Sequence, residues 1–425
     1  MHLEKVTLKN YTAFDDLEID LQPGINLLVG DNGAGKTSVL DGIAVALGGL
    51  FVNVEGVSAR NIMKDDVHMV VNAMGDASTT ISYCEPVSVG CVFKVDDKEF
   101  NWSRIKEEMS STHTKTDNKS ASLWMKKITN QPDTNLPLLS FQSAARVWKV
   151  KRGDFGSEAK RRLDDRRCGY IGCLDQSMDV KAIQQWYMKQ EHTAFIKGKS
   201  IREYENFKSI ISGFMKEINE LSEVPTVYYS RQFEELVYAD QNQEIAVSKL
   251  SAGYQSLLWM VMDLAYRVCI LNPELEDKTE IQGVVLIDEI DMHLHPKWQW
   301  NIIKALSAAF PNVQFIITTH SPIVISSAKE ANLIFLDGKK KVKYLPECYG
   351  FAVEDVLQYR QESVPRPKIV QTIVDEIDEA LDDDEFDIAE QALGKLKAVL
   401  GEENQEYKYL AGRVKDAKLV WECQE

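Results

Sequence analysis

One stretch of the chain fits the pattern G-x-x-x-x-G-K-[ST] of a phosphate-binding loop: Gly30-Asp31-Asn32-Gly33-Ala34-Gly35-Lys36-Thr37-Ser38. The apolar run from Ile25 to Val29 before it predicts a buried strand, and apolar residues recurring from Thr37 to Leu50 predict a helix after it. The strand therefore leads the loop to a helix N-terminus, where backbone N–H groups and the helix dipole face an anion. We expect this loop to decide both the fold and the binding site.

The residue types in the loop suit this task. The glycines let the backbone bend around a phosphate without clashes of Cβ atoms. We expect Lys36 to reach the β- and γ-phosphates and the hydroxyl of Thr37 to bind Mg²⁺. The residues expected to contact the nucleotide are Asp31, Asn32, Gly33, Ala34, Gly35, Lys36, Thr37 and Ser38.

Acidic residues follow a second apolar run, Val284 to Ile287. A carboxylate at the end of a buried strand beside a phosphate-binding loop is where Mg²⁺ is held, so Asp288 is a candidate metal ligand. The next residue, Glu289, is the candidate catalytic carboxylate that polarises a water against the γ-phosphate. The alternative is an ordinary acidic end of a strand.

Two further polar residues follow predicted strands. His320 comes after the run from Phe315 to Thr319 and could hydrogen-bond the γ-phosphate and sense its loss. Gln142 ends the apolar run that begins at Leu136 and could contact the metal or the attacking water. We therefore count both as candidate catalytic residues, and Gln142 also as a candidate metal ligand.

A second candidate for phosphate binding is Ser251-Ala252-Gly253, at the start of a predicted helix that runs to about Asn272. It lies more than 200 residues from Lys36. One nucleotide with two such separate segments suggests that two chains close over it. The alternative is that Ser251 is a plain helix N-cap.

Composition limits the class of protein. The chain has 425 residues, 44% of them hydrophobic, and a formal net charge of −16, which argues against a uniformly basic surface for nucleic acid. Its 7 cysteines are scattered, which suits a reduced cytosol, and we expect a cytoplasmic protein. The longest apolar run, Leu257 to Leu271, is interrupted by Asp263 and Arg267, so no membrane contact is expected.

The pattern of elements predicts an α/β fold with two parts. Residues 1–345 are expected to form a head with a mixed or parallel central sheet, an antiparallel β subdomain and a short helical insertion over residues 149–225. Residues 346–425 are expected to form a C-terminal helical appendage that docks a partner. We expect a solvated loop from Ser110 to Asn130, with one short helix around Leu123 to Ile128.

Three other features leave alternatives open. His293 and His295 could form a metal pair, but their place after Glu289 favours a structural or dimer-contact loop. The run Asp382-Asp383-Asp384-Glu385 could bind a nuclease metal, but its place between amphipathic helices favours a solvated acidic turn. The basic segment 149–167 could bind nucleic acid.

Taken in order, these motifs resemble those of the ATP-binding-cassette superfamily, in its SMC/Rad50/RecF/OLD-like branch. Gly30–Ser38 matches Walker A, Leu250–Gln255 the signature motif, Val284–Glu289 Walker B, and Thr319–Pro322 the switch histidine. The signature departs from the usual form, with Ala252 in place of a glycine and Tyr254 inserted before the glutamine. Gln142 is the candidate for the Q-loop glutamine.

Within that branch the chain is similar to the ATPase subunit of Septu-type anti-phage systems, which also occurs beside retron reverse transcriptases. It lacks the long coiled-coil insertion of Rad50 or SMC proteins and the Toprim pattern of OLD nucleases. The segments that carry this similarity are Leu136–Trp148, Tyr170–Tyr187, Tyr349–Arg366 and the helical tail.

The resemblance implies an ATPase that binds ATP and Mg²⁺ and forms a homodimer, or a higher even-numbered oligomer, with ATP at the interface. Ser251 of one chain would contact phosphates bound by Lys36 of the other. It further implies a separate HNH nuclease subunit as effector and a reverse transcriptase with its RNA/DNA product as a further partner. No nuclease activity of the chain itself is expected. The alternative function is an ATP-dependent DNA-binding protein of DNA repair, of RecF or SMC type.

Overall fold

The computed structural model describes residues 1–73, 79–144, 165–176, 178–230, 232–233, 235–338, 340–360 and 366–422. The chain divides into two compact units, Met1–Gly350 and Phe351–Glu425, which we call the head and the tail. The head combines helices and sheets, whereas the described part of the tail is helical.

A six-stranded sheet forms the centre of the head, with the strand order β16-β15-β3-β14-β13-β9. All neighbouring strands pair in parallel except β15 and β16. Every residue of β9, β13 and β14 is buried, which explains the continuous apolar runs in the sequence. The strands are β3 (Ile25–Gly30), β9 (Leu138–Gln142), β13 (Gly283–Ile287), β14 (Val313–Thr318), β15 (Asn332–Leu336) and β16 (Val342–Leu345).

The parallel register places the carboxyl ends of five strands, β15, β3, β14, β13 and β9, at one edge of this sheet. Gln142 lies beside Ile287, and Ile287 lies beside Ile317 of the next strand. Thr318 pairs with Leu28, two residues before the phosphate-binding loop. The three predicted catalytic segments therefore meet the loop at the same edge.

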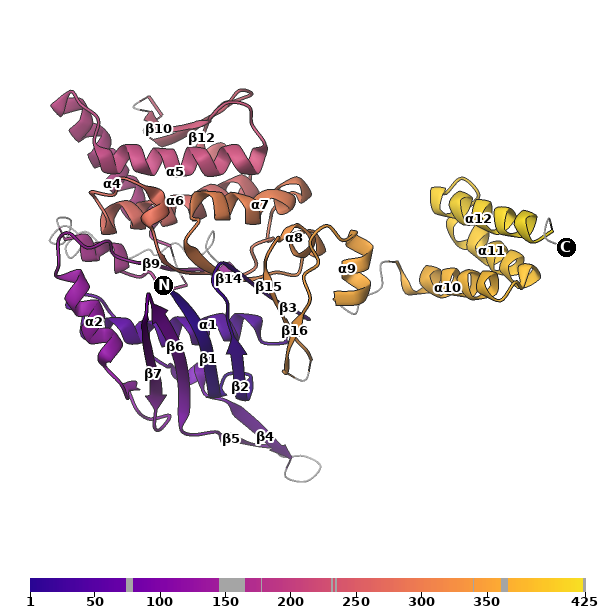
Figure 1. Ribbon diagram of the computed structural model, residues 1–425, viewed down its shortest axis with the longest axis horizontal. Coiled ribbons are helices and arrows are strands. Elements are labelled where there is room, and N and C mark those ends of the chain that lie inside the picture. Colours follow the sequence, from indigo (N-terminus) through magenta and orange to yellow (C-terminus); the bar gives the residue numbers. More distant parts are fainter. Residues whose placement is uncertain are drawn as a thin grey trace. The chain divides into compact units, whose positions relative to one another are not determined.

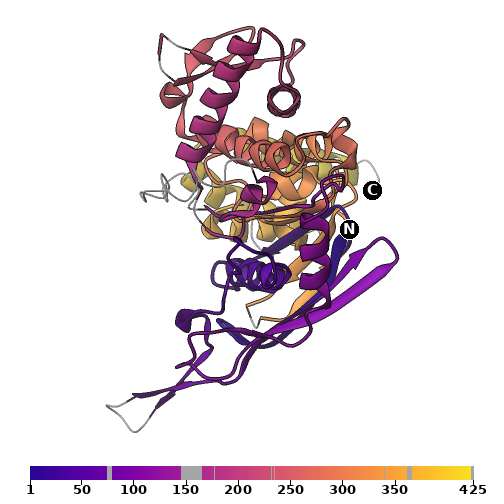
Figure 2. The same ribbon diagram turned by 90° about the vertical axis from the view of Figure 1, so that its left-hand side faces the viewer.

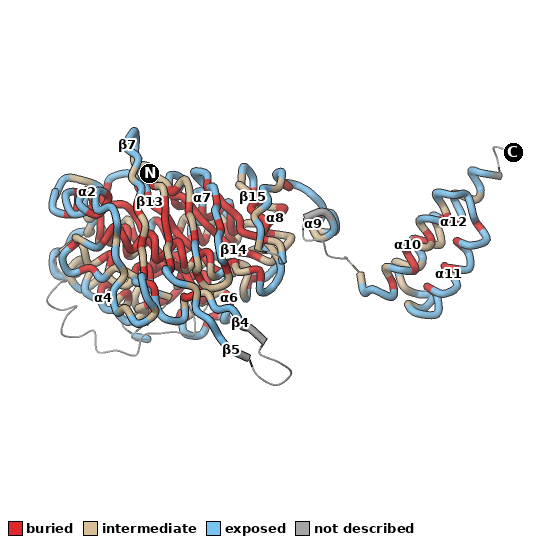
Figure 3. Tube along the Cα trace, turned by 90° about the horizontal axis from the view of Figure 1, so that it is seen from below, coloured by how far each residue is buried: buried red, intermediate tan, exposed pale blue. Residues whose placement is uncertain are grey.

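An antiparallel sheet with the order β2-β1-β6-β7-β8 lies on the other side of α1 (Lys36–Gly48), as Figure 1 shows. α1 is packed between the two sheets, and many of its residues belong to the buried core. The strands of the central sheet labelled in Figure 3, such as β13 and β14, run through the buried interior of the head. A separate hairpin, β4–β5, extends from this region (Figure 2). The strands are β1 (His2–Tyr11), β2 (Phe14–Asp20), β4 (Met69–Ala73), β5 (Thr79–Tyr83), β6 (Val87–Val95), β7 (Lys98–Lys106) and β8 (Lys115–Thr116).

Helices cover the opposite face of the central sheet. α6 and α7 lie on the side away from α1, and α5 packs along both of them (Figure 1). A small antiparallel sheet of β10 (Thr226–Ser230), β11 (Glu235–Ala239) and β12 (Glu244–Ala246) adjoins α5. The helices of the head are α2 (Ser120–Thr129), α4 (Val180–Lys197), α5 (Arg202–Asn219), α6 (Ala252–Leu271), α7 (Pro296–Ala309) and α8 (Pro322–Ser327). Short 3₁₀ turns are η1 (Gly49–Phe51), η2 (Lys64–Asp66), η4 (Arg166–Tyr170), η5 (Val247–Lys249) and η6 (Lys278–Glu280).

The short helix expected around Leu123 to Ile128 is present, but it is longer than predicted and is not solvated on all sides. α2 occupies Ser120–Thr129 and buries Ala121, Met125 and Ile128 against the head. These three residues recur at spacings of four and three, a helical pattern that the many polar residues around them obscure.

The tail contains α9 (Val353–Arg360), α10 (Lys368–Asp382), α11 (Phe386–Leu400) and α12 (Gln405–Glu422). The last three share a core of their own, made from the periodic apolar residues that predict them, such as Ile377, Leu396 and Val414. None of the described helices, in head or tail, is both long and apolar enough to cross a membrane.

Candidate active site

The lysine of the phosphate-binding loop, Lys36, donates hydrogen bonds back to the backbone of the same loop. Lys36 is only 7% exposed, and its ammonium donates hydrogen bonds of 2.9 Å to the carbonyl oxygens of Gly30 and Asp31. Burial lowers the pKa of Lys36, and the carboxylates of Asp288 and Glu289 oppose that effect. The lysine is therefore held inside the loop, next to the acidic end of β13.

Glycine is required at two places in this loop. Gly30 has φ +147°, and a Cβ atom there would lie 2.2 Å from the carbonyl oxygen of Leu336. Gly35 has φ +99°, and a Cβ atom there would lie 2.5 Å from the ring of Phe14. The loop therefore has no room for side chains where it passes β15 and β2.

Hydroxyl and carboxylate oxygens gather beside the loop. The hydroxyl of Thr37 lies 3.1 and 3.2 Å from the two carboxylate oxygens of Asp288, which is only 3% exposed. The hydroxyl of Thr318, at the end of β14, donates to Asp288 Oδ1 at 2.7 Å. Oxygen donors of this kind are those that Mg²⁺ prefers, so the residues present fit this ion.

Glu289 has a left-handed backbone, with φ +46°. Its N–H donates to the hydroxyl of Thr318 at 2.7 Å, so this threonine contacts both Asp288 and Glu289. Non-glycine residues rarely adopt a positive φ, and those that do often lie at functional sites. The turn directly after β13 therefore has a backbone held by Thr318 and carries two successive acidic residues.

His320 lies at the end of the neighbouring strand. Asp291 holds this segment, because its Oδ1 accepts hydrogen bonds from the hydroxyl of Thr319 at 2.6 Å and from the N–H of His320 at 3.3 Å. Burial and the positive charge of Lys36 lower the pKa of His320, which favours the neutral imidazole near pH 7.

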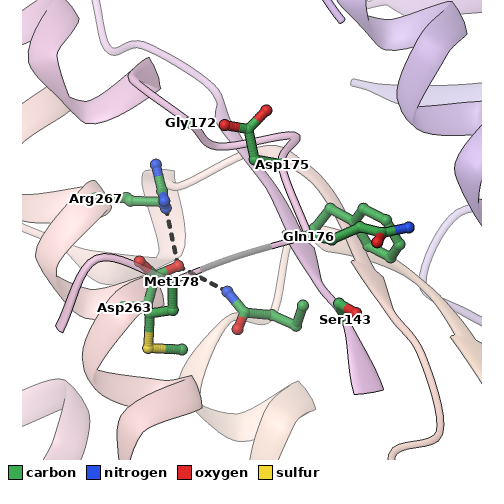
Figure 4. A pocket seen from close by; sticks show the side chains of 9 residues that line it. Ser143, Gly172, Asp175, Gln176, Met178, Asp263 and Arg267 are labelled. Carbon is green, nitrogen blue, oxygen red and sulfur yellow. Dashed lines mark hydrogen bonds and ion pairs between the residues drawn. The ribbon is translucent and has the colours of Figure 1, made fainter. Parts of the chain in front are cut away.

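Gln142 is also at this edge, but its side chain is bound elsewhere. Its amide nitrogen donates to Asp263 on α6 at 2.7 Å and to the hydroxyl of Ser140 at 2.9 Å. Arg267 donates to the same oxygen of Asp263 at 2.9 Å (Figure 4). Both bonds of Gln142 use the amide nitrogen, whereas the predicted role as metal ligand or as partner of the attacking water would use the amide oxygen.

Ser251, Ala252 and Gly253 form the start of α6. Ser251 is its N-cap, and its side chain accepts a hydrogen bond of 3.4 Å from the N–H of Tyr254. Ser251 and Ala252 are exposed, whereas a Cβ atom on Gly253 would lie 2.3 Å from the carbonyl oxygen of His293. The segment thus packs on the loop after Glu289 and leaves its serine accessible.

Two protein-family models match this chain. A family model described as "AAA domain" matches residues 5–224, just over half of the chain. The chain belongs to this AAA-domain family. A second model, described as "AAA ATPase domain", matches residues 159–325.

Two relatives resemble this AAA-domain protein over most of its length. It is 26% identical over 378 residues to "Retron Vc95 probable ATPase" of Vibrio cholerae serotype O1 biovar El Tor, covering 77% of this chain and 72% of that one. It is 24% identical over 423 residues to "Septu protein PtuA" of Bacillus thuringiensis, covering 95% of each chain. The predicted ATPase activity and the resemblance to Septu and retron ATPases are confirmed.

A solved structure shows the fold. The AAA-domain protein matches an SMC head bound to the C-terminal winged-helix domain of ScpA with a TM-score of 0.50 and 16% identity, over 81% of this chain and 98% of that one. The predicted ABC-type α/β head is therefore confirmed as a fold of the SMC-head kind.

The sequence analysis does not predict the contacts of several residues at the site of the AAA-domain protein. Thr318 and Asp291 lie in strand and loop patterns that give no sign of their contacts. Asp263 and Arg267 did leave a signal, because they are an oppositely charged pair four residues apart in an otherwise apolar helix. In the sequence they interrupt the apolar run from Leu257 to Leu271, and nothing there points to their contact with Gln142.

The candidate histidine pair and the candidate acidic metal site lie at a helix N-terminus and at a turn. His295 is the N-cap of α7, and its Nδ1 accepts from the N–H of Lys297 at 3.2 Å. No cluster of three or more His, Cys, Asp or Glu residues suited to a metal occurs in the ranges that the structure describes. In the acidic run, Asp382 ends α10 and Asp383–Glu385 form the turn between α10 and α11.

The basic segment 149–167 lies outside the described residues up to position 164. Its last two arginines contact the protein itself. Arg166 donates to the carbonyl oxygens of Gln131 and Thr134, and Arg167 pairs with Asp165.

Proposed function

We propose that the protein is the ATP-hydrolysing switch subunit of an anti-phage defence complex of Septu or retron type. The observation that carries the ATP site is the meeting of Lys36, Thr37 and Asp288 at one edge of the central sheet. The similarity to a retron ATPase and to a Septu protein supports the defence role.

Binding of ATP would open the loop. The ammonium of Lys36 would leave the carbonyl oxygens of Gly30 and Asp31 and donate instead to phosphate oxygens, which are stronger acceptors. Backbone N–H groups of the loop residues 31–38 would donate to the same triphosphate. The hydroxyl of Thr37 and the carboxylate of Asp288 would hold Mg²⁺, and this ion supplies charge neutralisation at the β- and γ-phosphates.

Hydrolysis would use the residues that follow β13 and β14. Glu289 would accept a proton from the attacking water as general base. His320, neutral because its pKa is lowered, would hydrogen-bond the γ-phosphate. Gln142, whose amide nitrogen is held by Asp263, would orient the water or the metal through its amide oxygen.

A second copy of the chain would complete the site. Ser251 and Ala252 are exposed at the N-terminus of α6, where backbone N–H groups attract an anion. In a head-to-tail homodimer, or a larger even-numbered assembly, Ser251–Gly253 of one copy would contact the phosphates held by Lys36 of the other. ATP would then stabilise the assembly.

The tail is the proposed docking unit for the effector, a separate HNH-type nuclease. From Val364 to Glu425 the sequence has 8 Lys or Arg against 16 Asp or Glu, so it would suit a basic partner. Nucleotide state in the head would hold or release this nuclease, and a reverse transcriptase with its RNA/DNA product is a further proposed partner.

The ATPase is tested by phosphate release from purified protein. We expect Mg²⁺-dependent hydrolysis that is lost in Lys36→Ala, together with ATP-dependent association of the Glu289→Gln variant in analytical ultracentrifugation. Equal rates in wild type and Lys36→Ala would assign the activity to a contaminant and reject the site.

Docking on the tail is tested by co-purification of the protein expressed with its neighbouring genes. We expect Val420→Lys to release the nuclease, because it places a positive charge on α12, where the side chain is 59% exposed and a basic partner would meet it. The matched control is Val224→Lys in the head, where the side chain is 58% exposed. Retention of the nuclease by Val420→Lys and loss by Val224→Lys would move the docking surface to the head.

The same preparation distinguishes the DNA-repair alternative. A RecF-type protein would bind duplex DNA in an ATP-dependent manner that weakens steeply with salt. Charge reversal at Arg161 and Arg162 would then abolish binding. We expect no such binding by the free protein.

A further inference from the structure

Tyr254 directly follows the exposed start of α6 and lies in a cluster built from other elements. Its ring packs edge-on against Trp298 of α7, with ring centres 4.7 Å apart and planes at 87°. It also contacts Tyr238 of β11, with ring centres 5.5 Å apart. Aromatic contacts from two elements therefore hold the first turn of α6.

Asn219, the last residue of α5, joins this cluster by hydrogen bonds. Its side-chain oxygen accepts from Trp298 Nε1 at 2.9 Å and from the hydroxyl of Tyr254 at 3.3 Å. Its amide nitrogen donates to the carbonyl oxygen of Met215 at 3.0 Å, which fixes the amide on the last turn of α5. One half-buried side chain thus connects α5, α6 and α7.

The first turn of α6 also packs against the loop that follows Glu289. The backbone of Gly253 passes so close to the carbonyl oxygen of His293 that a Cβ atom would lie 2.3 Å from it. The same Cβ position lies 3.6 Å from the ring of Trp298, so the first turn of α6 contacts both this loop and the Tyr254 cluster. A reorientation of the whole turn would therefore move Tyr254 against Trp298 and Asn219.

We propose that Asn219, Trp298 and Tyr254 are positioning residues that set the orientation of Ser251–Gly253, so that the end of α5 controls hydrolysis by the assembled pair of chains. This inference rests on the proposed function, because Ser251 would act on the nucleotide held by the second copy. None of the three residues belongs to the phosphate-binding loop or to the turn after β13. They act on completion of the site and not on binding of ATP to Lys36 of the same chain.

The test compares hydrolysis, association and nucleotide binding in matched variants. Trp298→Phe keeps a ring against Tyr254 but removes the N–H donor, and Asn219→Ala removes the acceptor. We expect each to lower kcat, and ATP-dependent association in a Glu289→Gln background, by roughly five- to tenfold. Binding of a fluorescent ATP analogue to dilute protein should stay within about twofold of the unchanged chain, since coupling acts only between copies.

Comparison of the single and double variants tests whether the hydrogen bond between Trp298 and Asn219 is responsible for the effect. Tyr254→Phe should show a smaller loss in the same direction, because only the longer bond is removed. The double variant of Trp298→Phe and Asn219→Ala should be no slower than Asn219→Ala alone, since both changes remove the same interaction. Lys304→Ala is the control, because it breaks an exposed ion pair with Glu217 between α7 and α5 without touching the cluster.

Three results would overturn the inference. A folded Trp298→Phe variant that hydrolyses and associates like wild type rejects it and leaves the proposed function standing. Loss of nucleotide binding together with kcat would show a merely structural role. Absence of ATP-dependent association in the Glu289→Gln background alone would reject both this inference and the two-chain site.

Discussion

The head and the tail of this protein are built from different kinds of contact. In the head, Thr37 and Asp288 meet although 251 positions separate them in the sequence. In the tail, the core joins three successive helices whose apolar residues recur at helical spacing. The comparison teaches that the candidate active site depends on the register of a long-range sheet, whereas the proposed docking unit depends mainly on local periodicity.

The largest expected difference between the two units concerns activity. Glu289→Gln should lower kcat by about 10²- to 10⁴-fold, because it removes the proposed general base. The same chemical change in the tail, Glu385→Gln in the exposed acidic turn, should leave kcat unchanged. Phosphate release measures both, and a slow Glu385→Gln variant would show that the tail takes part in hydrolysis.

Ion pairs offer a second contrast, in stability. Arg267→Met should cost about 3–5 kcal/mol, because it leaves the carboxylate of Asp263 buried without its charged partner. Arg413→Met breaks the exposed tail pair with Asp378 and should cost less than about 1 kcal/mol. Chemical unfolding measures both, and a loss of similar size in the two variants would contradict the contrast.

A third contrast concerns backbone freedom within the tail. Gly394 lies in the interior of α11 with nothing within 4 Å of an added Cβ atom, so Gly394→Ala should stabilise that helix by up to about 1 kcal/mol. Gly401 has the same open space but φ +84°, so Gly401→Ala should destabilise it by about 1 kcal/mol. Amide hydrogen exchange in α11 would detect both changes, and effects of equal sign would refute the argument.

The smallest expected effect is a pH dependence confined to the head. His320 has a lowered pKa, so between that value and the ordinary value near 6.5 the folded head binds fewer protons than the unfolded chain. The stability from this site is therefore present above about pH 6.5 and is lost as pH falls through the folded pKa. The sequence has no histidine in the tail, which should not respond through this group.

Imidazole NMR signals test the cause of this shift. Lys36→Met should raise the pKa of His320, since it removes the positive charge that lowers it after burial. An unchanged pKa would mean that burial alone is responsible.

Local sequence patterns were sufficient for much of this protein. The phosphate-binding loop, the buried strands on either side of it, the start of α6 and three tail helices all follow from glycine spacing, apolar runs and helical periodicity. Each of these depends on residues within one or two turns or one strand, so the sequence determines them without knowledge of the fold.

Other features were decided only by tertiary structure. Thr318 contacts both Asp288 and the N–H of Glu289, Asp263 holds the amide of Gln142, and Asn219 joins Tyr254 to Trp298. No local pattern encodes these contacts, because each joins residues on different elements whose distance depends on sheet register and helix packing. Side-chain chemistry therefore identified the candidates, and long-range packing decided which of them meet.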